Sequence, residues 1–151
     1  MLTVNDVMTP QVITTSDDQT IKNAARVMAN HGISSLIVFS DDGLKGILTE
    51  KDIVTRVVCA GLDPDKVRVG EVMSEPVIVI TPDTPLEKAV NLMMMHRIKK
   101  LPVMEKIDDA YKLSGILSLI DVARIQPDII NSLKEMVQVE TESMAPAFYV
   151  C

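Results

Sequence analysis

The sequence predicts a mixed α/β (α+β) fold in which one β-α-β-β-α unit occurs twice. The first observation is a repeated segment. Residues 46–52 (GILTEKD) and 115–121 (GILSLID) share a glycine, two apolar residues, a hydroxyl residue and, three positions later, an aspartate. The second is a longer match, because a shift of 65 residues aligns residues 7–38 with residues 72–103 at many apolar, aspartate and histidine positions. A match of this density indicates an internal duplication.

Each copy is predicted to begin with a strand and a helix. Short β-prone runs lie at residues 12–15 and 77–80, and turn residues follow each of them. Apolar residues then recur at i, i+3, i+4 and i+7, which predicts helices over residues 21–28 and 86–93. Pro85 suits the first position of the second of these helices.

Two more strands and a last helix complete each copy. These elements are predicted, in chain order, as a strand at 36–39, a strand ending at Thr49, a helix at 53–60 stopped by Gly61, a strand at 101–104, a strand ending at Ser118 and a helix at 122–125. The second copy holds four extra residues, because Gly46 and Gly115 are 69 positions apart rather than 65. We therefore expect repeat 1 at residues 1–61, a linker at 62–68, repeat 2 at 69–126 and a C-terminal helix and tail at 127–151.

The composition limits the classes of partner. The net charge is −6, aromatic residues make up 3% of the chain and there is no Trp, so the chain would repel a phosphate backbone and lacks a platform for stacking bases. No apolar run approaches the ~20 residues of a membrane span, and the N-terminus lacks the pattern of a signal peptide. We expect a cytoplasmic protein that binds neither nucleic acid nor membrane.

Cysteine and histidine usage does not favour a metal or a catalytic site. Cys59 and Cys151 have no disulfide-framework or zinc spacing, and we expect Cys59 to be a buried thiol. His31 and His96 recur at the ends of the first helices, where positive charge is favoured, and two such residues are too few for a metal site. The sequence has no evident nucleophile–base pair and no Gly-rich phosphate loop, so we expect no metal, no required cofactor and no enzyme.

The hydroxyl and the carboxylate at each second-helix start have two interpretations. Thr49 with Asp52, and Ser118 with Asp121, fit a helix cap in which the side chains satisfy free amides. The same groups suit a sugar-phosphate ligand, because helix amides favour anions and a carboxylate accepts from ribose hydroxyls. The two roles can coexist, so both remain open.

Taken together, these segments resemble a tandem pair of CBS domains, a Bateman module. The resemblance covers roughly residues 4–125 and rests on the DVMT and EVMS openings at residues 6–9 and 71–74, the HRIKKLPV strand entry at 96–103, and the two repeated glycine segments. It implies two repeats packed sheet to sheet around a pseudo-twofold axis. It also implies two clefts that bind adenosine-containing ligands such as AMP, ADP, ATP or S-adenosylmethionine, and a regulatory rather than catalytic role.

The resemblance also implies the ligand contacts. Asp52 and Asp121 would accept from ribose hydroxyls, Thr49 and Ser118 would contact phosphate or ribose, and the backbone near Ile13 and Ile78 would read adenine. The expected sets are Ile13, Ser34, Ser35, Thr49 and Asp52 for the first cleft, and Ile78, Lys99, Lys100, Ser118 and Asp121 for the second. Because the lysines are in the second set, we expect that cleft to prefer charged phosphates.

The first helix of the second copy suggests an interface. Residues 92–95 (LMMM) make that helix apolar nearly all round, and Met side chains adapt well to helix contacts. We expect a homodimer, unless the tail at residues 127–151 covers this surface. The functional alternatives are a ligand sensor that acts by conformational change, and a dimerisation or docking scaffold with empty clefts that works through the Met-rich helix and the tail.

Overall fold

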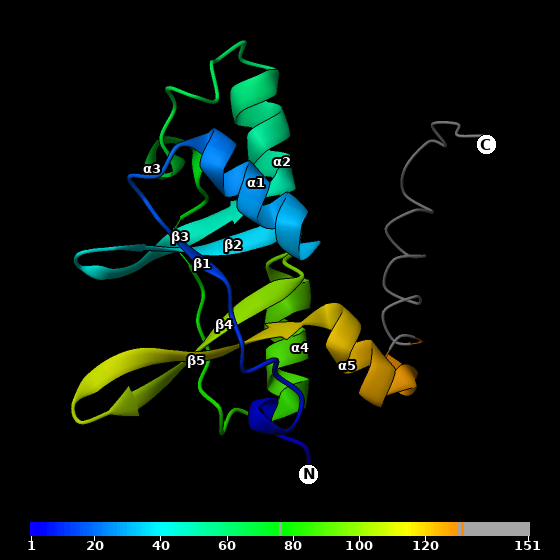
Figure 1. Cartoon of the computed structure of the whole chain (residues 1–151). Coiled ribbons are helices and arrows are strands. Elements are labelled where there is room, and N and C mark those ends of the chain that lie inside the picture. The colour runs from blue at the N-terminus through cyan, green and yellow to red at the C-terminus, as the bar shows by residue number, and fades with distance from the viewer. Residues whose placement is uncertain (76, 130, 132–151) are drawn as a thin grey trace, which may run out of the picture.

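The computed structural model describes residues 1–75, 77–129 and 131, and Figure 1 shows its course. The elements are, in chain order, η1 (Val4–Asp6), β1 (Thr14–Ser16), α1 (Ile21–His31), β2 (Ser35–Ser40), β3 (Gly43–Thr49), α2 (Glu50–Ile53), the π-helix η2 (Val54–Val58), α3 (Val69–Val72), α4 (Leu86–Met95), β4 (Lys100–Ile107), β5 (Ala110–Ser118) and α5 (Leu119–Ile125). This order confirms a mixed α/β fold with two equivalent halves.

Each half has its own small sheet. β1 pairs in parallel with β2, β2 pairs antiparallel with β3, and β4 and β5 form a separate antiparallel pair. Both antiparallel pairs change register at the same repeat position, between Val38 and Phe39 in the first half and between Val103 and Met104 in the second. Such irregularities bend and twist a strand locally. The duplication therefore extends to the shape of the hairpins.

The strand predicted at residues 77–80 is wrong, since only Ile80 pairs there, through one parallel bridge to Val103. The Ile80 N–H donates to the Pro102 carbonyl (3.1 Å), and the Ile80 carbonyl accepts from the Met104 N–H (2.8 Å). In the first half, Ile37 is the equivalent of Pro102 and pairs with Thr14. Proline has no N–H to donate, so the second ladder cannot continue as the first one does.

Both second helices begin earlier than predicted, directly after the hydroxyl residue. The Thr49 Oγ1 accepts from the Asp52 N–H (3.2 Å), and the Ser118 Oγ accepts from the Asp121 N–H (3.1 Å). These bonds satisfy amides that a helix start leaves unpaired. The capping interpretation is confirmed for both hydroxyls. The predicted first helices are confirmed, and α1 ends at His31, followed by Gly32, whose left-handed conformation (φ 62°) is typical of the residue after a helix.

Cys59 is exposed, which contradicts the expected buried thiol. It directly follows η2, a helix that buries Val57 and leaves Val58 exposed. Only one face of this helix meets the core, and Cys59 does not lie on it. Cys151 lies outside the described residues.

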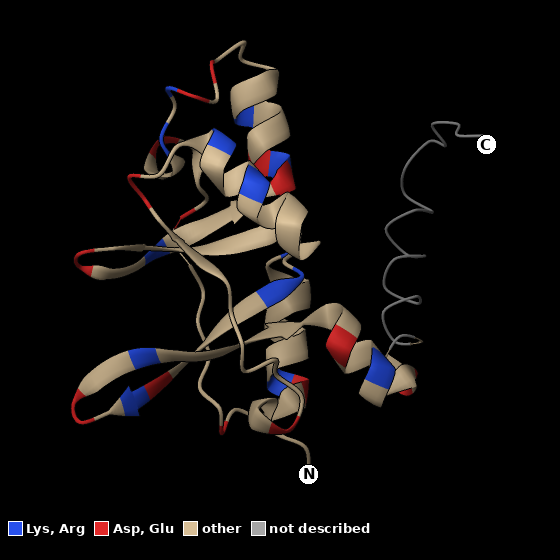
Figure 2. Cartoon of the chain, viewed as in Figure 1, with Lys and Arg blue, Asp and Glu red and all other residues tan. Residues whose placement is uncertain are grey.

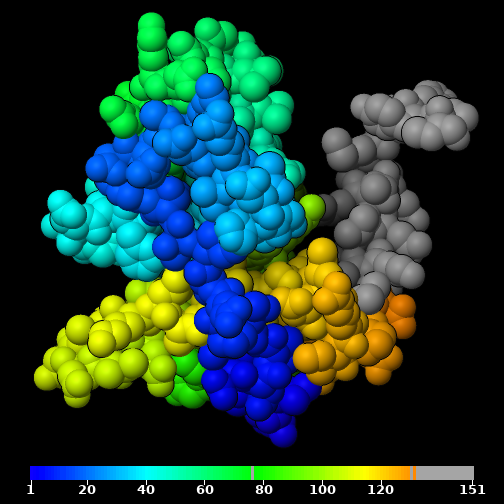
Figure 3. All heavy atoms as spheres, in the orientation of Figure 1, coloured from blue at the N-terminus to red at the C-terminus, as the bar shows by residue number. Residues whose placement is uncertain are grey.

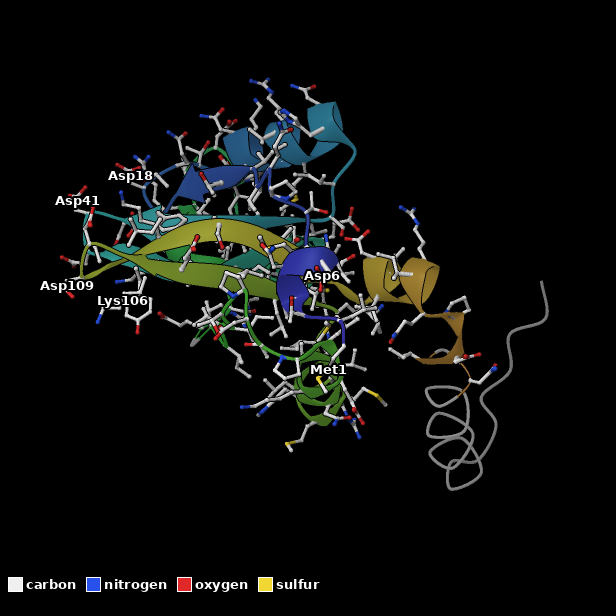
Figure 4. All side chains as sticks on the ribbon, turned by 90° about the horizontal axis from the view of Figure 1, so that it is seen from below. Met1, Asp6, Asp18, Asp41, Lys106 and Asp109 are labelled. Atoms are coloured by element: carbon white, nitrogen blue, oxygen red, sulfur yellow. The ribbon has the colours of Figure 1, made fainter. Side chains whose placement is uncertain are left out.

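The two sheets lie between the helices. Figure 1 shows the β2–β3 and β4–β5 hairpins one above the other and pointing the same way, and Figure 4 shows their tips, marked by Asp41 and Asp109, on one side of the molecule. In the same view α1 and α4 lie on opposite sides of the strands. The sheet-to-sheet arrangement expected from the resemblance is confirmed.

The segment before each half packs on the other half. Val4 and Val7, at the N-terminus, belong to the core of the second half, whereas Val69 and Val72 belong to the core of the first. The Val4 N–H donates to the Thr84 carbonyl (2.9 Å), which anchors this crossing. Figure 3 shows the blue N-terminal residues lying against the yellow and orange second half. The two halves are thus joined by exchange of their leading segments, and the α3 helix lies in the second of these.

Most charged residues lie outside the central strands. Figure 2 shows the positions of Lys, Arg, Asp and Glu along the ribbon, most of them on helices, loops and hairpin tips, whereas the strands in the middle are mostly uncharged. Among the described residues, no helix is both long and apolar enough to cross a membrane.

Candidate functional site

A cavity of about 230 Å³ lies where the two halves meet. Its apolar lining comes mainly from the first half, and its polar lining from both. The apolar members are Val12, Ile13, Ile33, Ile37 and Ile116, and the polar ones are Thr9, Gln11, Ser35, Lys100, Ser118 and Asp121. A mostly apolar pocket with a few convergent polar groups is the usual form of a small-molecule site. We call it the Asp121 cavity.

Asp121 supplies the negative charge of this cavity. Its Oδ2 accepts from the Thr9 Oγ1 at 3.3 Å, a long hydrogen bond, and its Oδ1 lies 3.9 Å from the guanidinium of Arg124. The side chain keeps 27% of its surface exposed. The carboxylate is therefore held in place by its neighbours and still has capacity to accept further hydrogen bonds from a ligand.

Lys100 supplies the positive charge. It stands at the start of β4, and its Nζ donates across the boundary between the halves to the Ser34 Oγ (3.2 Å) and the Ser35 Oγ (3.0 Å). Both partners are neutral hydroxyls, so these two contacts do not neutralise the positive charge of Lys100. An ammonium has three protons to donate, and two of them are used here. The third is available to an anionic group.

Asp52, the counterpart of Asp121, is more enclosed. Its Oδ2 accepts from the Thr49 N–H (3.0 Å), its Oδ1 accepts from the Ser74 Oγ (2.9 Å), and the Arg56 Nε lies 3.9 Å from that Oδ1. Only 8% of the Asp52 side chain is exposed. Both oxygens therefore have good partners within the protein, and the pair of Thr49 and Asp52 forms a reciprocal capping box.

The expected site residues are grouped differently from the two sets that the resemblance implied. Ile13, expected beside Asp52, lines the same cavity as Ser118 and Asp121, and Ser35 and Lys100 line it together. The exchange of leading segments is the reason, because it carries residues 9–13 onto the β5–α5 junction through the Thr9–Ile116 bridge. The other expected residues do not line the Asp121 cavity: Ser34, Thr49, Asp52, Ile78 and Lys99.

Ile78, Lys99 and Ser34 lie outside the Asp121 cavity and have other contacts. Ile78 is half-buried against the core of the second half, and Lys99 is exposed while its carbonyl accepts from the Leu119 N–H (2.9 Å). Ser34 lines a second hollow, described below, and its carbonyl accepts from the Glu50 N–H (3.1 Å). The lining residues that the sequence did not single out are Thr9, Gln11, Val12, Ile33, Ile37 and Ile116. The repeated sequence pattern alone gave no sign that Thr9 contacts Asp121.

The glycine of each repeated segment has a packing role. A Cβ on Gly115 would lie 2.8 Å from the Thr9 carbonyl oxygen and 2.8 Å from the Met8 Sδ, and one on Gly46 would lie equally close to Ser74 and Met73. These distances are too short for carbon contacts, so only glycine lets the crossing segment pair with the strand. Part of the repeated pattern thus reflects chain packing rather than ligand chemistry.

A wider groove of about 760 Å³ lies between α1 and the α2–η2 helix. Its lining is largely apolar or small, and the residues are Ala25, Met28, Ala29, Gly32, Ile33, Ser34, Glu50, Ile53, Val54 and Lys100. Val54 is 54% exposed although it is a large apolar residue. We call this surface the α1–α2 groove. Lys100 lines both hollows, so it links the groove to the Asp121 cavity.

Metal-binding residues do not come together in the described part of the chain, where no group of three or more His, Cys, Asp and Glu side chains is close enough to hold an ion. The His31 Nδ1 lies 2.9 Å from the Val27 carbonyl on its own helix. Its position at the last residue of α1 agrees with the expected helix-end histidine.

Comparison with known proteins identifies relatives of the same size. YhcV, a CBS domain-containing protein of Bacillus subtilis, is 40% identical over 123 residues, which cover 82% of this chain and 84% of YhcV. Hypoxic response protein 1 of Mycobacterium tuberculosis is 32% identical over 129 residues, with 85% and 87% covered. A crystal structure of Hypoxic Response Protein I with two coordinated zinc ions superposes with a TM-score of 0.73 at 31% identity, covering 83% of this chain and all of that one.

A ligand-bound structure is also similar. The CBS domain pair of MJ0100, in complex with 5′-methylthioadenosine and S-adenosyl-L-methionine, superposes with a TM-score of 0.70 at 27% identity and covers 82% of this chain and 94% of that one. The sequence profile of the CBS domain matches residues 4–58 and again residues 69–128. These two matches account for both halves and confirm the resemblance inferred from the motifs. The chain belongs to the CBS domain family and carries a tandem pair of CBS domains.

Proposed function

We propose that this chain is a non-catalytic regulatory module that binds an adenosine-containing ligand, either an adenine nucleotide or S-adenosylmethionine, in the Asp121 cavity. One observation carries the proposal: the cavity between the repeats combines an accessible carboxylate, an ammonium and an apolar lining. The adenosyl ligands of the MJ0100 domain pair support the ligand class.

Each lining group has a chemical match in such a ligand. Asp121 accepts from the ribose hydroxyls, since charged acceptors form the stronger hydrogen bonds. Ile13, Ile37 and Ile116 line the cavity and would make apolar contacts with an aromatic base. Lys100 would bind a phosphate group through the positive charge of its ammonium. Ser118 lies at the β5–α5 junction, close to Asp121.

Binding would act by conformational change. The cavity walls come from both repeats, and Lys100 already spans the boundary through Ser34 and Ser35. A ligand that contacts both repeats stabilises the arrangement in which both sets of contacts form, and shifts the population toward it. The change then reaches the α1–α2 groove, because Lys100 and Ile33 line both hollows.

We further propose a homodimer that uses the α1–α2 groove. The small residues Ala25 and Ala29 allow close approach of a second helix, and Met28 can adapt its shape to it. This groove is also the observation that favours the second candidate function, a dimerisation scaffold whose cavities stay empty. The proposed repeat boundaries, residues 1–61 and 69–126, allow either function.

Calorimetric titration with AMP, ADP, ATP and S-adenosylmethionine at physiological salt tests the proposal. We expect saturable binding of at least one of them, and a loss of about 10- to 150-fold in affinity for Asp121→Asn, the range for hydrogen bonds to charged groups. Asp109→Asn is the matched control, because it removes the same charge from an exposed hairpin turn far from the cavity. If none of the four ligands binds, the scaffold becomes the better explanation.

A further inference from the structure

We propose that each chain has one working ligand site, the Asp121 cavity, and that Arg56 closes the equivalent place around Asp52. The inference rests on the proposed function and deepens it by naming the number of sites and the ligand class. It follows from differences between two halves that are equivalent in sequence and in fold.

The two carboxylates differ in what they already bind. Asp52 accepts a backbone N–H at 3.0 Å and the Ser74 hydroxyl at 2.9 Å, whereas Asp121 accepts one hydroxyl, from Thr9, at 3.3 Å. Ser74 and Thr9 are equivalent in the repeat, so the same contact is tighter on the Asp52 side. Side-chain exposure follows the same order, with 8% for Asp52 and 27% for Asp121. A ribose would have to displace the partners of Asp52, but could add to those of Asp121.

Arg56 adds a second difference, which lies in its own hydrogen bonds, because each carboxylate has an arginine 3.9 Å away, Arg56 beside Asp52 and Arg124 beside Asp121. Its Nη1 donates to the carbonyls of Val72 (3.0 Å) and Met73 (2.9 Å), and its Nε lies 3.9 Å from the Asp52 Oδ1. The guanidinium therefore ties the α2–η2 helix to the crossing segment directly beside the carboxylate. The equivalent residue in the second half is Ile125, which has no hydrogen-bond donor in its side chain and is 50% exposed. Ile125 therefore cannot make these two bonds, and Arg124, the arginine beside Asp121, has a side chain that is 76% exposed.

The charges of the Asp121 cavity select the ligand. Lys100 is the one cation among its lining residues, and Asp121 is an anion in the same space. A single phosphate can pair with Lys100, while further phosphates would add repulsion from Asp121 and from a chain of net charge −6. The volume of about 230 Å³ lies below the roughly 300–1,000 Å³ common for ligand pockets, which favours a small ligand. We infer a nucleoside monophosphate, with AMP preferred to ATP.

Calorimetry with AMP and ATP on the full chain tests both parts. We expect one AMP per chain and at least 10-fold weaker binding of ATP. Asp121→Asn should abolish or weaken AMP binding at least 10-fold, whereas Asp52→Asn should change it less than threefold. Because a substitution at the buried Asp52 also affects stability, Arg56→Met provides a second test. This variant should keep the first site and expose a second, weaker one, giving a stoichiometry between one and two.

The outcomes separate this inference from the proposed function. Two AMP per wild-type chain, or a loss of binding in a folded Asp52→Asn variant equal to that in Asp121→Asn, overturns the single-site inference and leaves the proposed function standing. Tighter binding of ATP than of AMP overturns the ligand class alone. The absence of binding by AMP, ATP and S-adenosylmethionine overturns the proposed function and the inference with it.

Discussion

Lys100 and Ser35 occupy equivalent positions in the two repeats, and in the folded chain the ammonium of Lys100 donates to the hydroxyl of Ser35 at 3.0 Å. Residues related by the duplication thus meet at the boundary between the halves. In an exactly symmetric pair they would be identical, and two lysines here would repel each other. Ser35 avoids that repulsion, and Lys100 supplies a positive charge to both the Asp121 cavity and the α1–α2 groove.

The first prediction concerns this shared cation. Lys100→Gln keeps a side chain that can donate to Ser35 but removes the charge, so we expect AMP affinity to fall by about 10- to 150-fold, as for hydrogen bonds to charged groups. Adenosine, which has no phosphate, should bind the variant and the wild type within about threefold. Calorimetry with both ligands measures the difference. Lys106→Gln, on the exposed part of β4, is the charge-matched control; equal losses for AMP and adenosine would refute the phosphate role.

The second prediction concerns the crossing of the N-terminal segment. Thr9 and Ile116 exchange two backbone hydrogen bonds of 2.9 Å, directly beside Gly115. A Cβ at Gly115 would meet the Thr9 carbonyl at 2.8 Å, and that backbone atom cannot move without weakening the bridge. We expect Gly115→Ala to lower the free energy of unfolding by about 1–3 kcal/mol, the usual cost of overpacking.

Urea unfolding monitored by circular dichroism measures this change. Lys112→Ala, an exposed substitution on the same strand, should stay within about 0.5 kcal/mol of the wild type and serves as the control. A Gly115→Ala protein as stable as the wild type would mean that the crossing segment is not held against β5 as described.

Much of the fold was predictable because it depends on local patterns. The i, i+3, i+4, i+7 spacing located α1 and α4, and the hydroxyl–aspartate pairs located the starts of α2 and α5 in the capping interpretation. The missing strand at residues 77–80 depended on a residue more than twenty positions away, since Pro102 removes a donor from the neighbouring strand. No local pattern in residues 77–80 contains that information.

The grouping of the site residues was not predictable for a related reason. Val4 and Val69 are equivalent, and so are Val7 and Val72, so each leading segment has the same apolar pattern for packing on its own half or on the other. The sequence is therefore consistent with both pairings. The structure has the exchanged one, with Val4 in the core of the second half and Val69 in that of the first. This exchange brings Ile13 to Asp121 rather than to Asp52.

The third prediction concerns the cap of α2. Thr49 accepts from the Asp52 N–H through its Oγ1 and donates its own N–H to the Asp52 carboxylate. Thr49→Ala removes the first bond, and we expect the free energy of unfolding to fall by about 0.5–2 kcal/mol, the range for lost N-cap hydroxyls. Thr49→Ser retains the hydroxyl and should recover most of that loss. Equal stabilities of the Ala and Ser variants in urea unfolding would show that the cap bond contributes little.

The fourth prediction tests the proposed dimer. Val54 lines the α1–α2 groove and is 54% exposed, so an aspartate there would keep its hydration in a monomer and would lose it in an interface. We expect Val54→Asp to shift the protein from dimer to monomer in sedimentation equilibrium. Ile107→Asp is the matched control, because Ile107 is 40% exposed on the β4–β5 hairpin, away from the groove; it should leave the dimer intact.

The same variants decide how the groove and the cavity are related. If binding in the Asp121 cavity reaches the groove through Lys100, AMP should change the dimerisation constant of the wild type, and Val54→Asp should change AMP affinity by a matching factor, because coupling between two binding events is reciprocal. A dimer whose dissociation constant is the same with and without saturating AMP would show that Lys100 contacts both hollows without coupling them. A wild-type chain that is monomeric throughout would instead remove the groove as a self-association surface.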